Sequence, residues 1–258
     1  MANTITILHL YPREMNLYGD HGNILTLVKR CEWRGIKTKV VEHEPGRALP
    51  KKIDIIFGGG GQDSGQNKIE ADLKKISPEL KKLVENGTPT LVICGLYQLF
   101  GKSFTTQDQR VIKGANILNL STTAGEERLI GNIVIKNNQF GQIVGYENHS
   151  GLTTLEDKSQ AFGEVVSGAG NNEEDQTEGC FYKNCIGTYL HGPILPKNPK
   201  VADFLIETAL KRQNPKFTKL QELDDSVEKA AHKSAANRPR WLTFLVICGI
   251  ISQLIAFY

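Results

Sequence analysis

A cysteine and a distant histidine are the residues of this sequence best suited to chemistry. Cys94 ends the apolar run Thr88-Pro-Thr-Leu-Val-Ile-Cys94 and is followed at once by Gly95. This pattern favours a buried strand that delivers a thiol to a tight turn, where backbone N–H groups face an incoming carbonyl and a helix N-terminus stabilises thiolate. Such geometry suits acyl transfer through a cysteine. The alternative is a small core residue at a strand end, the more common role of a buried cysteine.

His191 is the candidate base for that thiol. It follows a second short apolar run, Cys185-Ile-Gly-Thr-Tyr-Leu190, and precedes Gly192-Pro193. At the carboxyl end of a strand, His191 can meet Cys94, take the thiol proton and later protonate a leaving amine. Considered without Cys94, it is more typical of a structural hydrogen-bonding residue.

Four successive glycines, Gly58 to Gly61, follow the predicted strand Ile53 to Phe57. Such a run costs backbone entropy, which indicates that the backbone must approach something closely. The loop could cradle a phosphate or supply N–H groups to an oxyanion. No Lys-Ser/Thr pair follows the glycines, so a nucleotide-binding loop is disfavoured. We favour an oxyanion loop because the Cys94 turn follows it in the chain.

The elements that must position these residues alternate between strand and helix. This order predicts an α/β fold with a mostly parallel, doubly wound sheet of the flavodoxin or Rossmann type, whose site lies at the carboxyl ends of the strands. Leu129 to Lys136 and Gln142 to Asn148 alternate like a hairpin and should flank that sheet as antiparallel strands. The other predicted strands are 4–10, 37–42, 53–57, 88–93 and 185–190, and the predicted helices are 22–33, 67–76, 78–85, 198–212 and 221–237.

Other polar clusters allow two interpretations each. The loop Asn16 to Asn23 could be functional, but a helix-capping turn is favoured, and we assign no chemistry to His21. Arg128 could hold a carboxylate with its two-pronged guanidinium, or it could be a solvated strand flank. The stretch Glu147 to Gly151 is equally ambiguous.

Composition and charge exclude several classes of protein. The 258 residues carry a net charge of +3 and no basic stripe, so we expect no nucleic-acid partner. The five cysteines are scattered and no secretory signal is evident, which favours reduced thiols in a cytoplasm. Cys180 and Cys185 form one isolated pair, so no metal site is expected.

Three segments are expected: a catalytic domain over 1–215, a charged helix or linker over 216–240, and an apolar tail over 241–258. The tail has no charged residue and follows Arg238 and Arg240. Its length and basic flank fit a membrane anchor with a cytoplasmic basic side, but an apolar helix that docks on a partner or an altered terminus fits equally well.

Taken together, the motifs resemble the class I, triad-type glutamine amidotransferases, in the branch similar to cobyric acid synthase. Within that branch the resemblance is nearest to the GatD-type subunits of lipid II isoglutaminyl synthases. It covers about residues 4 to 215. The motifs that carry it are Asn16-Leu-Tyr-Gly-Asp-His-Gly-Asn23, Gly59-Gly-Gly61 with Asp63, Ile93-Cys94-Gly95 with Tyr97-Gln98, Arg128, Val144-Gly-Tyr-Glu-Asn-His149 and Gly187-Thr-Tyr-Leu-His191-Gly-Pro193.

The resemblance implies a glutaminase subunit that hydrolyses L-glutamine to glutamate and ammonia through a cysteine thioester. The ammonia would pass to a Mur-ligase-like partner of the MurT type, in a heterodimer, which amidates the D-glutamate of lipid II to D-isoglutamine. ATP and Mg would belong to the partner and no cofactor to this chain. The implied roles are nucleophile for Cys94, proton shuttle for His191, oxyanion donors for Gly60, Gly61 and Gly95, and substrate binding for Arg128 and Gln98.

Alternatives remain within the same fold. The partner could direct the ammonia to another carboxylate such as a corrinoid, or the chain could be a non-catalytic interaction subunit or a cysteine hydrolase. Leu96 stands where class I enzymes commonly carry a second glycine, and we expect it to crowd the turn. Pro193 stands where a glutamate often orients the histidine, so we expect an acid from the partner to complete the triad and the free subunit to be a poor glutaminase.

Overall fold

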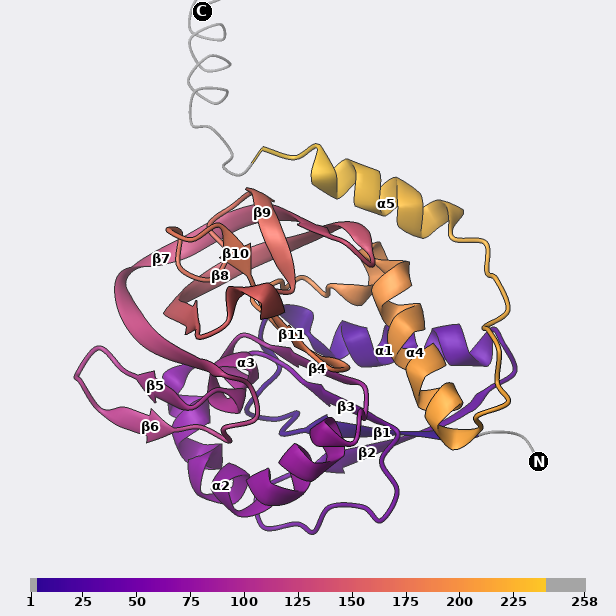
Figure 1. Cartoon of the computed structure of the whole chain (residues 1–258), viewed down its shortest axis with the longest axis horizontal. Coiled ribbons are helices and arrows are strands. Elements are labelled where there is room, and N and C mark those ends of the chain that lie inside the picture. The colour runs from indigo at the N-terminus through magenta and orange to yellow at the C-terminus, as the bar shows by residue number, and fades with distance from the viewer. Residues whose placement is uncertain (1–3, 240–258) are drawn as a thin grey trace, which may run out of the picture.

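The computed structural model describes residues 4–239 of the chain, and within them the strands form two sheets (Figure 1). The first sheet contains β1 (Thr4–Leu10), β2 (Lys37–His43), β3 (Ile55–Gly58), β4 (Thr90–Ile93), β11 (Cys180–Tyr182) and β12 (Cys185–Thr188). The second contains β5 (Ser103–Thr105), β6 (Val111–Lys113), β7 (Leu120–Asn137), β8 (Gly141–Leu155), β9 (Gly163–Ser167) and β10 (Thr177–Glu178). The helices are α1 (His21–Glu32), α2 (Asp63–Glu85), α3 (Gly95–Phe100), α4 (Pro199–Gln213) and α5 (Ser226–Ala236), with single 3-10 turns η1 (Leu17–Gly19), η2 (Lys158–Gln160) and η3 (Leu195–Lys197).

The first sheet confirms the predicted α/β fold. Its order is β11-β12-β4-β3-β1-β2, and every neighbouring pair is parallel except β11 with β12 at the edge. Because β3, β4 and β12 are adjacent and parallel, the loops that follow them meet at one edge of the sheet. Those loops carry the glycine run, Cys94 and His191.

Helices cover both faces of this sheet, which explains why its central strands are apolar on both sides. β3 and β4 are buried along their whole length. The helices α1 and α4 pack against each other, and α2 lies on the other side of the strands (Figure 1). This layered core holds the strand ends rigidly.

The two helices predicted on either side of Pro78 are one continuous helix, α2, so that prediction is wrong. Pro78 cannot donate a backbone hydrogen bond, and a proline inside a helix costs about 3 kcal/mol. An apolar stripe continues through it with helical spacing and is buried along its length, which outweighs that cost. The stripe consists of Ile69, Leu73, Ile76, Leu80 and Val84.

The second sheet contains the predicted hairpin, which is longer than the sequence pattern indicated. β7 and β8 pair antiparallel from Leu120–Leu155 to Asn137–Gly141. The pairing is interrupted once: Ala124 pairs with Gly151 and Leu129 with His149, so residues 125–128 bulge out opposite Ser150. Bulges of this kind redirect side chains next to functional sites.

The segment after α4 runs back along the domain to α5, which contacts β7 and β8 (Figure 1). Arg30 of α1 anchors this segment, because its fully buried guanidinium pairs with Asp203 of α4 and with Asp225 just before α5, each at 2.7 Å. None of the helices within residues 4–239 is long and apolar enough to cross a membrane. The predicted tail function concerns residues 241–258, which lie outside the described part of the chain.

Candidate active site

Cys94 occupies the sharp turn that the sequence predicted. Its backbone has φ 47° and ψ −103°, a left-handed conformation that costs a non-glycine residue about 1–3 kcal/mol. The next residue begins α3, and a Cβ on Gly95 would come within 2.9 Å of the Gly61 nitrogen. Glycine is therefore required at 95, and the turn brings the glycine loop against the cysteine.

Leu96 does not crowd this turn, contrary to our expectation. Its side chain is fully buried and points towards Gly58, where a Cβ would lie 2.2 Å from Leu96 Cδ1. Because Gly58 on the neighbouring strand β3 has no side chain, the Leu96 side chain fits there without displacing the turn. The Leu96 departure gives no structural reason for a loss of turnover.

His191 lies next to Cys94, across the backbone of Gly60. A Cβ on Gly60 would be 2.6 Å from His191 Cε1 and 3.2 Å from Cys94 Cβ. The histidine backbone is held by two hydrogen bonds with Tyr146 of β8, one in each direction at 2.8 and 3.2 Å. The imidazole is therefore fixed between the two sheets, and the structure brings the two predicted catalytic residues together.

Asp20 supplies an acid that the sequence analysis did not find. Its Oδ1 lies 3.3 Å from His191 Nδ1, and both side chains are completely buried. Asp20 comes just before α1, the place of a capping residue, yet its side chain makes no capping hydrogen bond. Instead, Asn16 Oδ1 accepts from the His21 amide at 2.8 Å. An acid from the same chain thus occupies the position for which we expected a partner residue.

The charges around His191 favour its protonated form. Burial acts against a charged imidazole, but it is outweighed by the nearby Cys94 and Asp20, which together raise the pKa of His191 to about 10. Cys94 acts through charge and a hydrogen bond, although His191 Nε2 makes no hydrogen bond of regular geometry within the described residues. The cluster therefore behaves as a coupled ionic group that can hold and release a proton at Nε2.

The glycine loop supplies fewer oxyanion donors than predicted. The Gly60 amide donates to Asp20 Oδ2 at 2.7 Å, so it is not directed at an oxyanion and that part of the prediction is wrong. The Gly61 backbone packs directly against Gly95 at the turn. Gly95 is also the first residue of α3, where backbone N–H groups have no acceptor within the helix. These two amides remain the candidate oxyanion donors.

A pocket of about 510 Å³ opens onto Cys94. Arg128 lines it, with its Nε and Nη2 donating to Asn148. Gln98 also lines it, but its side-chain oxygen accepts from Gln66 at 2.7 Å and its nitrogen donates to the Tyr189 hydroxyl at 3.1 Å. Gln98 therefore shapes the pocket floor, while Arg128 is the predicted residue whose charge is available to a substrate.

His149 also lines this pocket, and its charge differs from that of His191. It is buried, stacks on Tyr189 with ring centroids 3.6 Å apart, and its Nδ1 donates to the Gly151 carbonyl at 2.8 Å. Burial, with a smaller effect from His191, lowers the pKa of His149 to about 3. His149 is therefore neutral and carries its proton on Nδ1.

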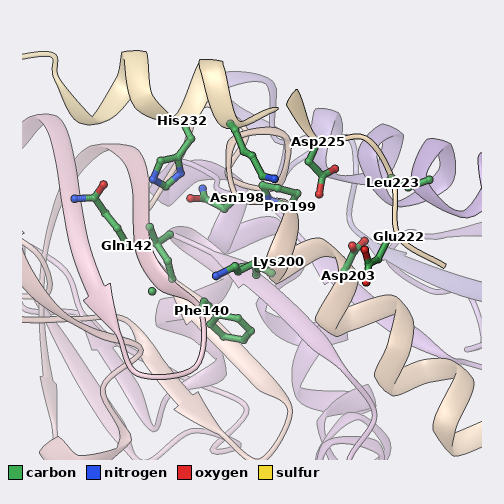
Figure 2. A pocket seen from close by; sticks show the side chains of 14 residues that line it. Phe140, Gln142, Asn198, Pro199, Lys200, Asp203, Glu222, Leu223, Asp225 and His232 are labelled. Carbon is green, nitrogen blue, oxygen red and sulfur yellow. The ribbon is translucent and has the colours of Figure 1, made fainter. Parts of the chain in front are cut away.

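Another pocket, of about 480 Å³, lies beneath α5, and Figure 2 shows its lining. Three of its polar side chains are engaged by the protein itself: Asp203 and Asp225 pair with Arg30, and His232 Nδ1 donates to the Lys197 carbonyl at 2.8 Å. None of the residues predicted to do chemistry lines it. We therefore place the functional site at Cys94.

Comparison with known proteins agrees with this site. A family model described as a CobB/CobQ-like glutamine amidotransferase domain matches residues 6–199, which include Cys94, Asp20 and His191. The chain is 43% identical to the lipid II isoglutaminyl synthase (glutamine-hydrolyzing) subunit GatD of Staphylococcus aureus, over 91% of this chain and 96% of that protein. It is 38% identical to the protein of the same name from Streptococcus pneumoniae, over 86% of each chain.

A solved structure has a similar fold. The structure of PurLQS from Thermotoga maritima aligns with a TM-score of 0.53 over 83% of this chain and 100% of the compared chain. The sequence identity is 15%, so the likeness concerns the fold alone.

Proposed function

The chain belongs to the family of CobB/CobQ-like glutamine amidotransferases, and from this premise we propose that it is the glutaminase subunit of a lipid II isoglutaminyl synthase. It hydrolyses L-glutamine to glutamate and ammonia at Cys94. The ammonia passes to a Mur-ligase-like partner of the MurT type, which uses ATP and Mg to amidate the D-glutamate of lipid II. The names and high coverage of the two GatD relatives support the substrate and the pathway.

The first half of the reaction forms a thioester. The Cys94 sulfur attacks the side-chain carbonyl carbon of glutamine, and the Gly61 and Gly95 amides stabilise the oxyanion. His191, which holds the thiol proton on Nε2, donates it to the departing nitrogen. The C–N bond breaks, ammonia leaves, and the glutamyl group remains on Cys94. Asp20 keeps the imidazole oriented and stabilises its positive charge.

The second half restores the enzyme. Water attacks the thioester carbonyl while His191 Nε2 accepts one of its protons. The C–S bond breaks, glutamate leaves, and the proton on His191 again balances the thiolate of Cys94. Throughout, Arg128 in the lining of the pocket binds the α-carboxylate, because its guanidinium carries the opposite charge and donates hydrogen bonds.

The observation that carries the proposal is the convergence of Asp20, Cys94 and His191 at one edge of the parallel sheet. Asp20 and His191 are buried and 3.3 Å apart, and both approach the cysteine across Gly60. A core cysteine with only a packing role would not need a left-handed backbone, a following glycine packed against a glycine loop, and a buried ionic partner.

Ammonia release from glutamine tests the proposal. The full chain, purified alone and with its co-purifying partner, should release glutamate and ammonia in equal amounts. Cys94→Ser should lower the rate by at least about a thousandfold. With lipid II, ATP and Mg present, the complex should form D-isoglutamine. Absence of glutamine-dependent ammonia from the wild-type complex would overturn the proposal.

The presence of Asp20 changes one expectation. From Pro193 alone we expect the triad acid on the partner and a weakly active free subunit. Because Asp20 already contacts His191 within the chain, we now expect the free subunit to hydrolyse glutamine at a rate within about tenfold of the complex. The comparison of the two preparations measures what the partner adds.

A lipid-linked acceptor places the complex at the inner face of the cytoplasmic membrane, and this belongs to the same proposal. Cell fractionation of the full chain and of a chain without residues 241–258 tests it. Membrane association that depends on the tail supports an anchor, whereas association that depends only on the ligase partner assigns that role to the partner.

A further inference from the structure

Arg128 lies at the end of the bulge in β7. Residues 125–128 stand opposite Ser150 alone, because Ala124 pairs with Gly151 and Leu129 with His149. The extra residues leave the strand ladder and lie along the pocket that opens onto Cys94. An exposed arginine on such a segment would ordinarily sample many rotamers, so its position requires other contacts.

Side chains hold the bulge at two points. Gln107 Nε2 donates to the Gly125 carbonyl at 3.0 Å at its start. Arg128 is held at its end by Asn148 of β8, which accepts three hydrogen bonds: Nε to Oδ1 at 2.9 Å, Nη2 to Oδ1 at 2.7 Å, and Nη2 to the backbone carbonyl at 3.1 Å. Asn148 itself pairs with Ile130 in the regular part of the hairpin. It therefore connects the exposed arginine to a regular part of the strand pair.

These contacts determine which part of the guanidinium is available. Nε and both donors of Nη2 face Asn148, and within residues 4–239 Nη1 makes no hydrogen bond or ion pair. Because the group is planar, fixing Nε and Nη2 also fixes the direction of the two N–H groups on Nη1. Arg128 and Asn148 both line the pocket, so a ligand at Cys94 meets an oriented positive charge.

We propose that Asn148 is a positioning residue for substrate selection: it holds Arg128 in the orientation that binds the α-carboxylate of glutamine. This inference rests on the proposed glutaminase function and deepens it. Preorganisation removes the entropy that Arg128 would lose on binding and strengthens the carboxylate contact. The site therefore selects a free amino acid with an unmodified α-carboxylate, and it selects against glutamine in a peptide whose carboxylate is an amide.

A double-mutant cycle on the full chain tests this role. Asn148→Ala should raise the KM for glutamine about tenfold and leave kcat within about twofold, since the chemistry at Cys94 is untouched. Arg128→Ala should raise the KM about a hundredfold. The double variant should behave like Arg128→Ala alone, because Asn148 acts only through Arg128. Asn132→Ala, an asparagine on the paired strand β7 outside the pocket, should leave KM and kcat unchanged.

Selectivity provides a second readout. Wild-type protein should prefer glutamine to γ-aminobutyramide, which lacks the α-carboxylate, and the preference should fall about tenfold in Asn148→Ala. Additive effects in the cycle would overturn the inference, as would an Asn148→Ala variant whose kcat falls while its KM stays unchanged, because that pattern shows only a smaller fraction of folded enzyme. If the wild-type protein releases no ammonia from glutamine, the proposed function fails and the inference with it. If the wild-type protein hydrolyses glutamine and Asn148→Ala has the same KM and selectivity as the wild type, the inference alone fails.

Discussion

The two walls of the pocket are built in different ways. On the wall from the first sheet, Cys94 lines the pocket, and Asp20 and His191 lie beside it. All three are buried and held largely by backbone: a left-handed turn, a glycine loop and a strand bridge. On the wall from the second sheet, Arg128 is exposed on a bulge and held by the side chain and carbonyl of Asn148. The first wall is suited to bond making, where small displacements are costly, and the second to recognition, where an exposed charge can meet its ligand.

The two buried histidines near Cys94 show the same contrast. His191 and His149 are both buried, yet the pKa of His191 is raised to about 10 while that of His149 is lowered to about 3. Burial disfavours the charged form of each ring. His191 has Asp20 and Cys94 as ionic partners, whereas His149 has a carbonyl and a tyrosine ring. Burial alone therefore does not determine the charge of these two histidines; their neighbours do.

The largest expected effect is on the catalytic wall. Asp20→Asn keeps the size of the side chain but removes the charge that orients and stabilises imidazolium at His191. We expect kcat for glutamine hydrolysis to fall about a thousandfold, or about 4 kcal/mol, with KM nearly unchanged. Steady-state ammonia release measures both. Asp157→Asn, in an exposed turn far from the site, is the matched control.

The same variant decides between the two sources of a triad acid. If Asp20→Asn is inactive alone but regains wild-type turnover with the partner bound, the acid comes from the partner, as the sequence analysis expected. If turnover stays low in both preparations, Asp20 is the acid that serves His191.

The second prediction uses the contrast between the histidines. As the pH falls below about 6.5, the unfolded chain protonates residue 149 while the folded chain does not, so His149 destabilises the fold progressively towards pH 3. The difference in unfolding free energy between wild type and His149→Gln should therefore change by about 2 kcal/mol between about pH 7 and about pH 5. Denaturant unfolding at the two pH values measures it.

His191 should behave in the opposite sense. Its folded pKa lies above its unfolded value, so its contribution to stability is complete below about 6.5 and is lost as the pH rises towards 10. A pH-independent difference between wild type and His149→Gln would show that His149 is charged in the folded chain, and the contrast between the two walls would then be wrong.

The parts of this site that could be predicted from sequence have local signals. Cys94 and His191 each follow a short apolar run and precede a glycine, and a parallel sheet brings such strand ends together. Asp20 had no such signal, because its contact with His191 joins distant parts of the chain and its place before α1 resembles that of a cap. The informative feature was the cluster of Asp, His and Asn around two glycines, which is more polar than a single cap requires.

The roles predicted for individual residues of the glycine loop and the cysteine turn also depended on contacts between elements that are distant in the sequence. Which amide of the glycine loop faces the cysteine depends on Asp20, which engages Gly60. Whether Leu96 fits depends on the absence of a side chain at Gly58, on a different strand. Gln98 follows the cysteine with the family's spacing, but two internal partners, Gln66 and Tyr189, occupy its amide. In each case a contact between separate elements determines the role.

The smallest expected effect is on the recognition wall. Arg128→Lys keeps the positive charge but cannot donate to Asn148 through a planar fork, so the charge is present without a fixed direction. We expect the KM for glutamine to rise about tenfold and kcat to stay within about twofold. Since the loss comes from orientation, Asn148→Ala should add little to Arg128→Lys. A kcat decrease as large as that of Asp20→Asn would instead show that Arg128 supports the chemistry at Cys94. The assignment of chemistry to one wall and recognition to the other would then be wrong.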